Sequence, residues 1–344
     1  MHCTELTRTR LLAWLSDSEI AAAGDATLRR SGHRPPAVAE TLHAVTEDPV
    51  SSSRLVTLVE NAKRAAGLPA ASTVIERWLL VHAAATMLSA ARAPRLGQAI
   101  LERTCAEIAR LLDDTWAIGE NLHVTGIRFR ELAKMVTGRR FSAGLFHWDI
   151  CGVSRSWLFK VPPRDVPGLV RALAKLRGLG PAMFPHLNPY RPPGHLAEPA
   201  ISGALAAMAE TLELRPDLHG LVAASWLRSP DVHRISPRLA AVNAPILAAG
   251  GFVTTVGAAP PDCGVFERSR ERLRLFREGR FTPTIGLVIW PRADMLRWWR
   301  SEQISRAMTI TSVPSSPSSM PARAPKPPPS PSRQVSSRRN RKRD

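Results

Sequence analysis

Apolar side chains recur every three or four residues through the first 140 positions of the chain, which is the spacing of amphipathic helices. The clearest segment is 97–114, where Ile100, Cys105 and Ile108 share one stripe and charged side chains such as Glu107 fall opposite. We therefore interpret Cys105 as a core residue. The same spacing predicts further helices at about 4–23, 52–66, 72–92 and 120–137.

The pattern changes after Gly138, where short apolar or β-branched runs are bounded by Gly, Pro and Ser. Such runs predict strands, and two of them are apolar almost throughout, as strands covered on both faces require. Helical stretches alternate with them; we expect Asp165 to cap one of these and Pro199 to open another. The predicted strands are 156–161, 220–227, 251–256 and 284–290. Short connections favour parallel neighbours, and a mixed sheet fits the same order.

These patterns predict an α/β or α+β fold, with a helical N-terminal region followed by a sheet of about four or more strands covered by helices. We expect the helical region to span 1–140 and the sheet-containing α/β domain to span 141–308. Residues 313–344 contain 8 Pro and 8 Ser and almost no large apolar side chains. That composition cannot offset the entropy of ordering, so we expect a disordered Pro/Ser-rich basic tail.

The chain is strongly basic, with 47 Lys and Arg against 29 Asp and Glu, a net charge of +18. This charge favours an anionic partner, such as nucleic acid, a nucleotide or acyl-CoA phosphate, or an acidic protein, and solubility explains it about equally well. No motif for sequence-specific nucleic-acid reading is present. The tail would contact nucleic acid or another anion without sequence preference. Its candidate contact residues are Arg338, Arg339, Arg341, Lys342 and Arg343.

Four widely spaced cysteines without a CxxC pair support neither a zinc site nor a disulfide framework. The first residues lack the basic stretch and apolar run of a secretory signal. The most apolar helix candidate begins at Trp78 and has only about 14 uncharged residues, too few for a membrane span. We therefore expect a cytoplasmic protein with no membrane span, and we predict no metal site.

The segment 184–198 is the first candidate site, because it holds the single tyrosine, Tyr190, between His186 and His195. Its prolines fix their own φ and bias the preceding residues toward extended backbone, so the path is stiff enough to hold side chains at a site. The imidazoles and the phenol could transfer protons. The spacing matches no zinc signature. A structural connection whose polar groups bond the backbone is the alternative.

Two further polar pairs are candidates for the same chemistry. His147 and Asp149 lie two apart, so in a strand they would line one face. Asp231 and His233 follow the predicted strand 220–227, and ligands of open α/β sheets gather beyond the carboxyl ends of strands. Each pair could equally be a histidine that bonds a neighbouring group for structure. The glycine patterns of P-loops, dinucleotide-binding folds and GxSxG hydrolases are absent from the sequence.

Residues 251–290, GFVTTVGAAPPDCGVFERSRERLRLFREGRFTPTIGLVIW, read as strand, loop, helix, turn and strand. This order, with its LFREGRF turn, resembles the closing part of GNAT-type acyltransferases, and the resemblance covers about 40 residues. It implies acyl-CoA as the cofactor and one of the candidate histidines or aspartates as the base. Two positions differ from that family's pattern. Phe276 stands where many members have a tyrosine acid, and the nearest counterpart of the pyrophosphate loop, at 175–180, ends a helix.

The sequence thus supports two functions. The first is an enzyme acting on a small molecule, with CoA-dependent acyl transfer to an amine as the specific expectation. The second is a non-catalytic protein that binds an anionic partner, such as nucleic acid, through its basic surface and tail. The oligomeric state cannot be read from the sequence.

Overall fold

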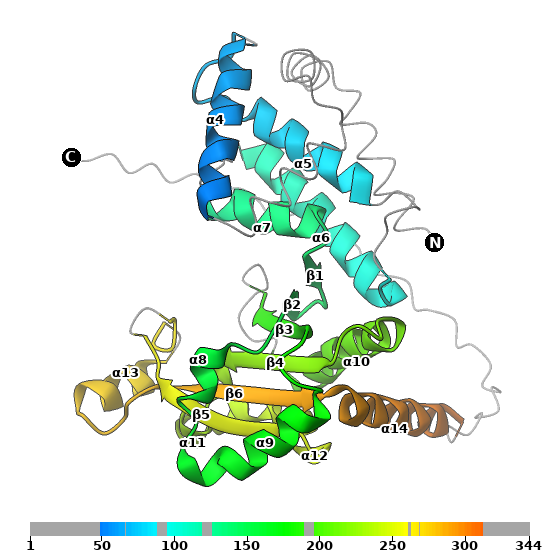
Figure 1. Ribbon diagram of the computed structural model, residues 1–344, viewed down its shortest axis with the longest axis vertical. Helices are drawn as coiled ribbons and strands as arrows, with labels where there is room; N and C mark the ends of the chain where they lie inside the picture. The colour runs from blue at the N-terminus through cyan, green and yellow to red at the C-terminus, as the bar shows by residue number, and fades with distance from the viewer. Residues whose placement is uncertain are drawn as a thin grey trace, which may run out of the picture. The chain divides into compact units, whose positions relative to one another are not determined.

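The computed structural model describes residues 49–65, 67–87, 95–118, 126–188, 196–260, 263–267 and 269–311. Its fold is mixed α/β, with a six-stranded sheet flanked by helices (Figure 1). The predicted fold class is therefore confirmed. The helix predicted at 4–23 and the predicted tail at 313–344 lie outside the described residues. The described residues up to Gln303 belong to one compact unit, and the domain boundary near residue 140 stays a prediction.

Four described helices precede the sheet. They are α4 (Pro49–Ala65), α5 (Val74–Met87), α6 (Gln98–Ile118) and α7 (Ile127–Val136). Their apolar stripes meet in a buried cluster that includes Leu55, Ile75, Ile108 and Phe129, which we call the helical cluster. Burial of one stripe from each helix is what stabilises helices of this length. Within the described residues, the helices predicted at 52–66, 72–92, 97–114 and 120–137 are confirmed.

The sheet has the strand order β1-β2-β3-β4-β6-β5. Its strands are β1 (Arg140–Ser142), β2 (Phe146–Cys151), β3 (Ala182–Leu187), β4 (Gly220–Ser225), β5 (Phe252–Ala258) and β6 (Thr284–Pro291). β3 and β4 are parallel, and the other neighbouring pairs are antiparallel. The sheet is therefore mixed. The carboxyl ends of β3 and β4 lie at the same end of the sheet, where β2 and β6 begin and β5 ends.

Helices cover both faces of the sheet (Figure 1). One face packs against α10 (Glu198–Leu214), α11 (Pro230–Ile235), α12 (Ala244–Ala248) and α14 (Arg292–Thr311), with Met208 and Trp290 at its centre. The other face packs against α8 (Arg155–Leu158) and α9 (Val166–Lys175), through residues such as Leu169 and Val222. The remaining elements are α13 (Arg270–Arg277) and three 3-10 turns, Pro163–Asp165, Trp226–Arg228 and Pro237–Val242.

The strands predicted at 220–227, 251–256 and 284–290 are confirmed as β4, β5 and β6, and Pro199 lies in the first turn of α10 as expected. The strand predicted at 156–161 is wrong, because this stretch begins in α8 and continues as a turn. Trp157 and Leu158 pack on the same cluster. Consecutive residues of a strand point to opposite faces, so only a helical turn allows this packing.

The expected capping role of Asp165 is also wrong. Asp165 precedes α9, but its side chain makes no capping hydrogen bond to that helix. Its carboxylate instead accepts a hydrogen bond from the hydroxyl of Thr254 on β5. The aspartate therefore links the start of α9 to the edge strand of the sheet.

Candidate functional site

The register of β1, β2 and β3 gathers polar side chains on one face of the sheet. Arg140 lies opposite Asp149, Ser142 lies opposite His147, and His147 lies opposite His186. Residues directly opposite in antiparallel strands point to the same side, as do residues two apart in one strand. Three of the predicted catalytic residues, His147, Asp149 and His186, are therefore brought onto a single surface.

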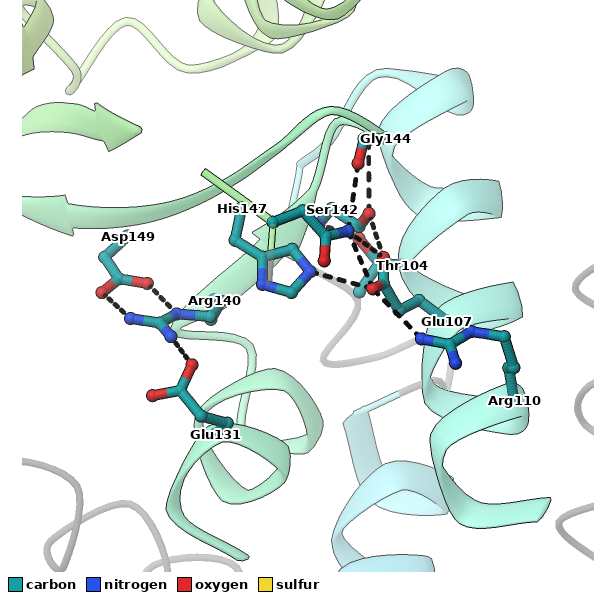
Figure 2. A network of polar contacts seen from close by, with 10 residues as sticks. Thr104, Glu107, Arg110, Glu131, Arg140, Ser142, Gly144, His147 and Asp149 are labelled. Carbon is teal, nitrogen blue, oxygen red and sulfur yellow. Dashed lines mark hydrogen bonds and ion pairs between the residues drawn. The ribbon is translucent and has the colours of Figure 1, made fainter. Parts of the chain in front are cut away.

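Asp149 is held from two sides. Arg140 donates from Nε to Oδ1 and from Nη2 to Oδ2, both at 2.6 Å (Figure 2). His186 Nε2 lies 3.2 Å from Asp149 Oδ2. Burial would raise the pKa of Asp149, but the hydrogen bonds of Arg140 and His186 outweigh burial and hold the pKa well below its usual range. The aspartate is therefore a fixed anion behind the imidazole of His186.

Arg140 is itself a buried connection between the sheet and the helices. Its side chain is only 8% exposed, and it pairs with Glu131 of α7 as well as with Asp149 (Figure 2). The two carboxylates compensate the charge of the guanidinium, and the fork of Arg140 fixes the orientation of Asp149. The chain of contacts runs from Glu131 through Arg140 and Asp149 to His186.

His186 is the accessible end of this chain. Its side chain is 38% exposed, and it lines a cavity of about 370 Å³ at the edge where β3 and β4 end. The ring of Phe184 lies 4.8 Å from the imidazole, centroid to centroid. Most of the cavity wall is apolar. The lining residues are Phe146, Phe184, Pro185, His186, Leu187, Ala224, Ser225, Trp226, Leu227, Arg228, Pro260, Cys263 and Ile285.

A second histidine–carboxylate pair lies beside the first, between α6 and the sheet. His147 Nε2 is 3.0 Å from Glu107 Oε1. Ser142 donates its hydroxyl to Glu107, and Asn188 Nδ2 donates to both carboxylate oxygens at 2.9 and 3.2 Å. The backbone N–H of Ser142 donates to Thr104 Oγ1 at 2.9 Å, so β1 is bonded twice to α6 (Figure 2). We call these residues the Glu107 network.

The Glu107 carboxylate is ionised in this setting. Burial would raise its pKa, but the hydrogen bond and charge of His147, with the bonds from Ser142 and Asn188, outweigh burial and lower the pKa to about 2. Glu107, His147, Ser142 and Asn188 are all buried, and none of them lines the cavity. The network is therefore a structural anchor, and it holds Asn188, the residue that directly follows β3.

Asp231 and His233 do not join His186. Both lie on α11, where Asp231 accepts a hydrogen bond from Thr284 Oγ1 at 2.8 Å and pairs with Arg234. His233 Nε2 lies 2.8 Å from the carbonyl oxygen of Leu227. Burial is the main cause that lowers the pKa of His233. These contacts fix the turn after β4 in place, and neither side chain lines the cavity.

The remaining predicted residues fall outside the described ranges. They are Tyr190 and His195 of the proline-rich segment, and Arg338, Arg339, Arg341, Lys342 and Arg343 of the tail. Among the residues that the structure describes, no cluster of His, Cys, Asp and Glu could hold a metal ion. No helix within the same ranges combines the length and the apolar character needed to cross a bilayer.

Two cysteines lie near the candidate site. Cys151, at the end of β2, has its pKa raised to about 11 by burial and by the charge of Asp149, so its thiol stays protonated at neutral pH. Cys263 lines the cavity. Both are free thiols. A cysteine nucleophile is activated by an electropositive setting, and the anion beside Cys151 has the opposite effect.

Sequence reasoning missed the residues that hold the site together. Arg140, Glu107 and Ser142 carry no local motif, and Glu107 falls on the polar side of its helix pattern. Arg228, the buried cation of the cavity wall, follows a predicted strand directly. An arginine immediately after an apolar strand, at the edge where ligands gather, is the one signal that could have identified it.

Comparisons with protein-family models, with curated proteins and with solved structures find no match to this chain.

Proposed function

We propose that this protein is an enzyme that acts on a small molecule and uses His186 to transfer a proton. The observation that carries the proposal is the chain Arg140–Asp149–His186, which ends in a solvent-accessible imidazole on the wall of a largely apolar cavity. An ionised carboxylate beside a histidine orients the ring and stabilises the imidazolium that forms when the histidine accepts a proton. Asp149 and Arg140 are positioning residues in this proposal.

The hydrogen bond to Asp149 assigns roles to the two ring nitrogens of His186. The Nε2 atom, 3.2 Å from Asp149 Oδ2, carries the proton that the carboxylate accepts. The Nδ1 atom is then the proton acceptor toward a substrate. The cavity wall near His186 is largely apolar, with Phe184 and Trp226, and it suits an alkyl or aryl substrate.

Acyl transfer to an amine is the reaction that we propose within this class, with acyl-CoA as the donor. The attacking amine must lose a proton, and His186 is placed to accept it. The resemblance of residues 251–290 to GNAT-type acyltransferases supports the same reaction. The three free thiols within the described residues agree with a reducing compartment, so we keep the cytoplasm as the proposed location.

The test is a screen of acyl-CoAs with primary amines, read out as release of the CoA thiol, followed by variants of the full chain. His186→Gln should lower kcat by about 100-fold or more, the contribution of a general base, with little change in KM. Asp149→Asn should also lower kcat and change its pH profile, because a neutral amide at this position cannot stabilise the imidazolium.

The matched control is His219→Gln. His219 directly precedes β4, at the end of that strand opposite to the cavity, so its loss should leave kcat unchanged. Full activity of the His186→Gln variant would reject His186 as the base. Turnover of other substrates but of no acyl-CoA would reject acyl transfer and retain the proton-transfer role.

The alternative proposal is a binding protein for an anionic partner such as nucleic acid, and its support is the net charge of +18. Binding through phosphates weakens steeply with salt. A chain truncated after residue 312 should then bind single- or double-stranded DNA more weakly than the full chain does, and the salt dependence should be shallower. Equal affinity of the two proteins at every salt concentration would exclude the tail from such binding.

A further inference from the structure

The cavity wall contains a buried cation, Arg228. It is the last residue of the 3-10 turn that follows β4, and it is 2% exposed. Its Nη1 donates to the carbonyl of Val242 at 2.6 Å and to Asn243 Oδ1 at 3.2 Å. Asn243 Nδ2 donates back to the carbonyl of Arg228 at 2.9 Å. These reciprocal bonds hold the guanidinium in one orientation.

No anion compensates this charge within the described residues. No carboxylate oxygen there lies within 4.0 Å of the guanidinium, and the nearest ring, Phe146, lies 5.4 Å from it, measured from Cζ to the centroid. Burial lowers the pKa of Arg228 to about 10, so the side chain is still charged at neutral pH. An isolated buried charge is costly to maintain, and proteins normally pair it.

The guanidinium also has unused donors. Nη1 is occupied by Val242 and Asn243, whereas Nε and Nη2 donate to no acceptor among the described residues. The Nε–Nη2 edge of an arginine is a planar fork that matches the two oxygens of a carboxylate or phosphate. Arg140 binds Asp149 through that same edge in this protein.

We propose that Arg228 binds an anionic group of the substrate, a carboxylate or a phosphate monoester carried on an apolar, alkyl or aryl, body. The argument is that Arg228 is buried, that its Nε–Nη2 edge has no partner among the described residues, and that it lines the same cavity as His186. Phe184, Trp226 and Ile285 supply apolar wall for the body of that molecule. The inference rests on the proposed function for its site, and it adds the substrate class.

The test measures binding and requires no turnover. Isothermal titration of the full chain uses benzoate and phenyl phosphate as probes, and benzamide and benzyl alcohol as uncharged counterparts. At least one anion should bind about 10-fold or more tightly than its uncharged counterpart, the effect expected of charge-assisted hydrogen bonds. The anion that binds more tightly shows whether the site prefers a carboxylate or a phosphate monoester. Equal binding of anions and uncharged counterparts overturns the proposal.

Arg228→Met provides the variant, because methionine retains an apolar side chain and lacks the charge. It should still fold, because removing the buried charge offsets the loss of the bonds to Val242 and Asn243, and it should lose the preference for the anion. A folded variant that keeps the preference overturns the proposal. If Arg228→Met does not fold, Arg228→Lys decides. Lysine should keep the preference with weaker binding, because it lacks the fork, and a lost preference overturns the proposal.

Two controls separate the possible sources of failure. His186→Gln should retain anion binding, so that loss of catalysis and loss of the anion subsite are distinguishable. Asp262, adjacent in sequence to the cavity residue Cys263, lies outside the described residues. Asp262→Asn should leave anion affinity unchanged. A clear increase in affinity would show that the chain's own aspartate neutralises Arg228, and the proposal would fail.

Discussion

At the scale of single residues, Arg140 determines the geometry of the site, because it fixes Asp149 and pairs with Glu131 in a buried setting. Arg140→Met should therefore lower the free energy of unfolding by about 3–5 kcal/mol, the cost of leaving a buried charge without its partner. Urea denaturation at neutral pH measures this change.

The control for this prediction is an ion pair with similar hydrogen bonds and greater exposure. Arg215 donates to Asp217 at 2.8 and 2.6 Å, but the side chain of Asp217 is 53% exposed. Arg215→Met should change the free energy of unfolding by less than about 1 kcal/mol, because water replaces the lost partner. Similar losses in the two variants would contradict the proposed role of burial.

Part of the candidate site could be predicted from the sequence. Alternation along a strand is a local rule, so the shared face of His147 and Asp149 was predictable. The partners of these two residues were not predictable. Arg140 reaches Asp149 from the neighbouring strand β1, and Glu107 reaches His147 from the helix α6. The local pattern also places Glu107 on the polar side of its helix. That side is buried only because β1 and β2 pack against it.

At the scale of elements, Gly286 lets β6 approach the turn that carries Arg228. A Cβ at this position would lie 2.3 Å from the backbone C and O atoms of Arg228, a contact that only a shift of the backbone can relieve. We expect Gly286→Ala to lower the free energy of unfolding by about 1–3 kcal/mol or more, the usual cost of overpacking. It should also weaken binding of the anionic probe, because Arg228 moves.

Gly203 is the matched glycine. It lies within α10, and a Cβ there would meet nothing within 4 Å. Gly203→Ala should therefore raise the free energy of unfolding by up to about 1 kcal/mol, because alanine has the higher helix propensity. Thermal or urea unfolding of the two variants side by side gives opposite signs if this assignment is correct.

The strands differ in how well the local sequence pattern predicts them. β4 and β6 are buried on both faces, so their apolar runs are visible in the sequence. β1, β2 and β3 carry one polar face, and β3 contains Pro185. The polar residues Ser142 of β1 and His147 of β2 are satisfied by Glu107 of α6, a helix that lies well before them in the sequence, and a local pattern cannot show that contact. The local pattern around β3 therefore favours a proline-rich loop with candidate side chains, where the structure has a strand.

At the scale of the whole molecule, two ionised carboxylates, the buried Glu107 and the half-buried Asp149, make the stability of the fold depend on pH. Glu107 has its pKa lowered from an ordinary 4.5 to about 2, and the pKa of Asp149 is also lowered. Their contribution to stability is thus fully present above about pH 4.5 and is lost as pH falls through the folded pKa. For Glu107 the loss amounts to about 3 kcal/mol.

Glu107→Gln isolates this contribution, because Asp149 titrates in both proteins. The difference in free energy of unfolding between wild type and variant should be largest at pH 6 and should shrink steadily toward pH 2.5. Urea denaturation at several pH values measures it. A difference that stays constant over that range would show that folding does not lower the pKa of Glu107.

The fold class could be predicted because periodicity and turn residues act locally along the whole chain. The mixed order of the sheet could not, because short connections favour parallel neighbours, whereas the pairing of β4 with β6 is antiparallel and joins segments more than 60 residues apart. Such pairing is determined by which apolar faces match, and it has no signature within either strand.

The Glu107 network has a consequence for how the helices can be attached to the sheet. Apolar side chains tolerate sliding past one another, whereas a carboxylate that bonds a hydroxyl, an amide and an imidazole has a single arrangement. Displacing α6 by one helical turn, about 5.4 Å, would leave the carboxylate of Glu107 buried without its hydrogen-bond partners. α6 therefore packs against β1 in a single register, and other alignments of the helix and the strand are disfavoured by the cost of burying an unpaired charge.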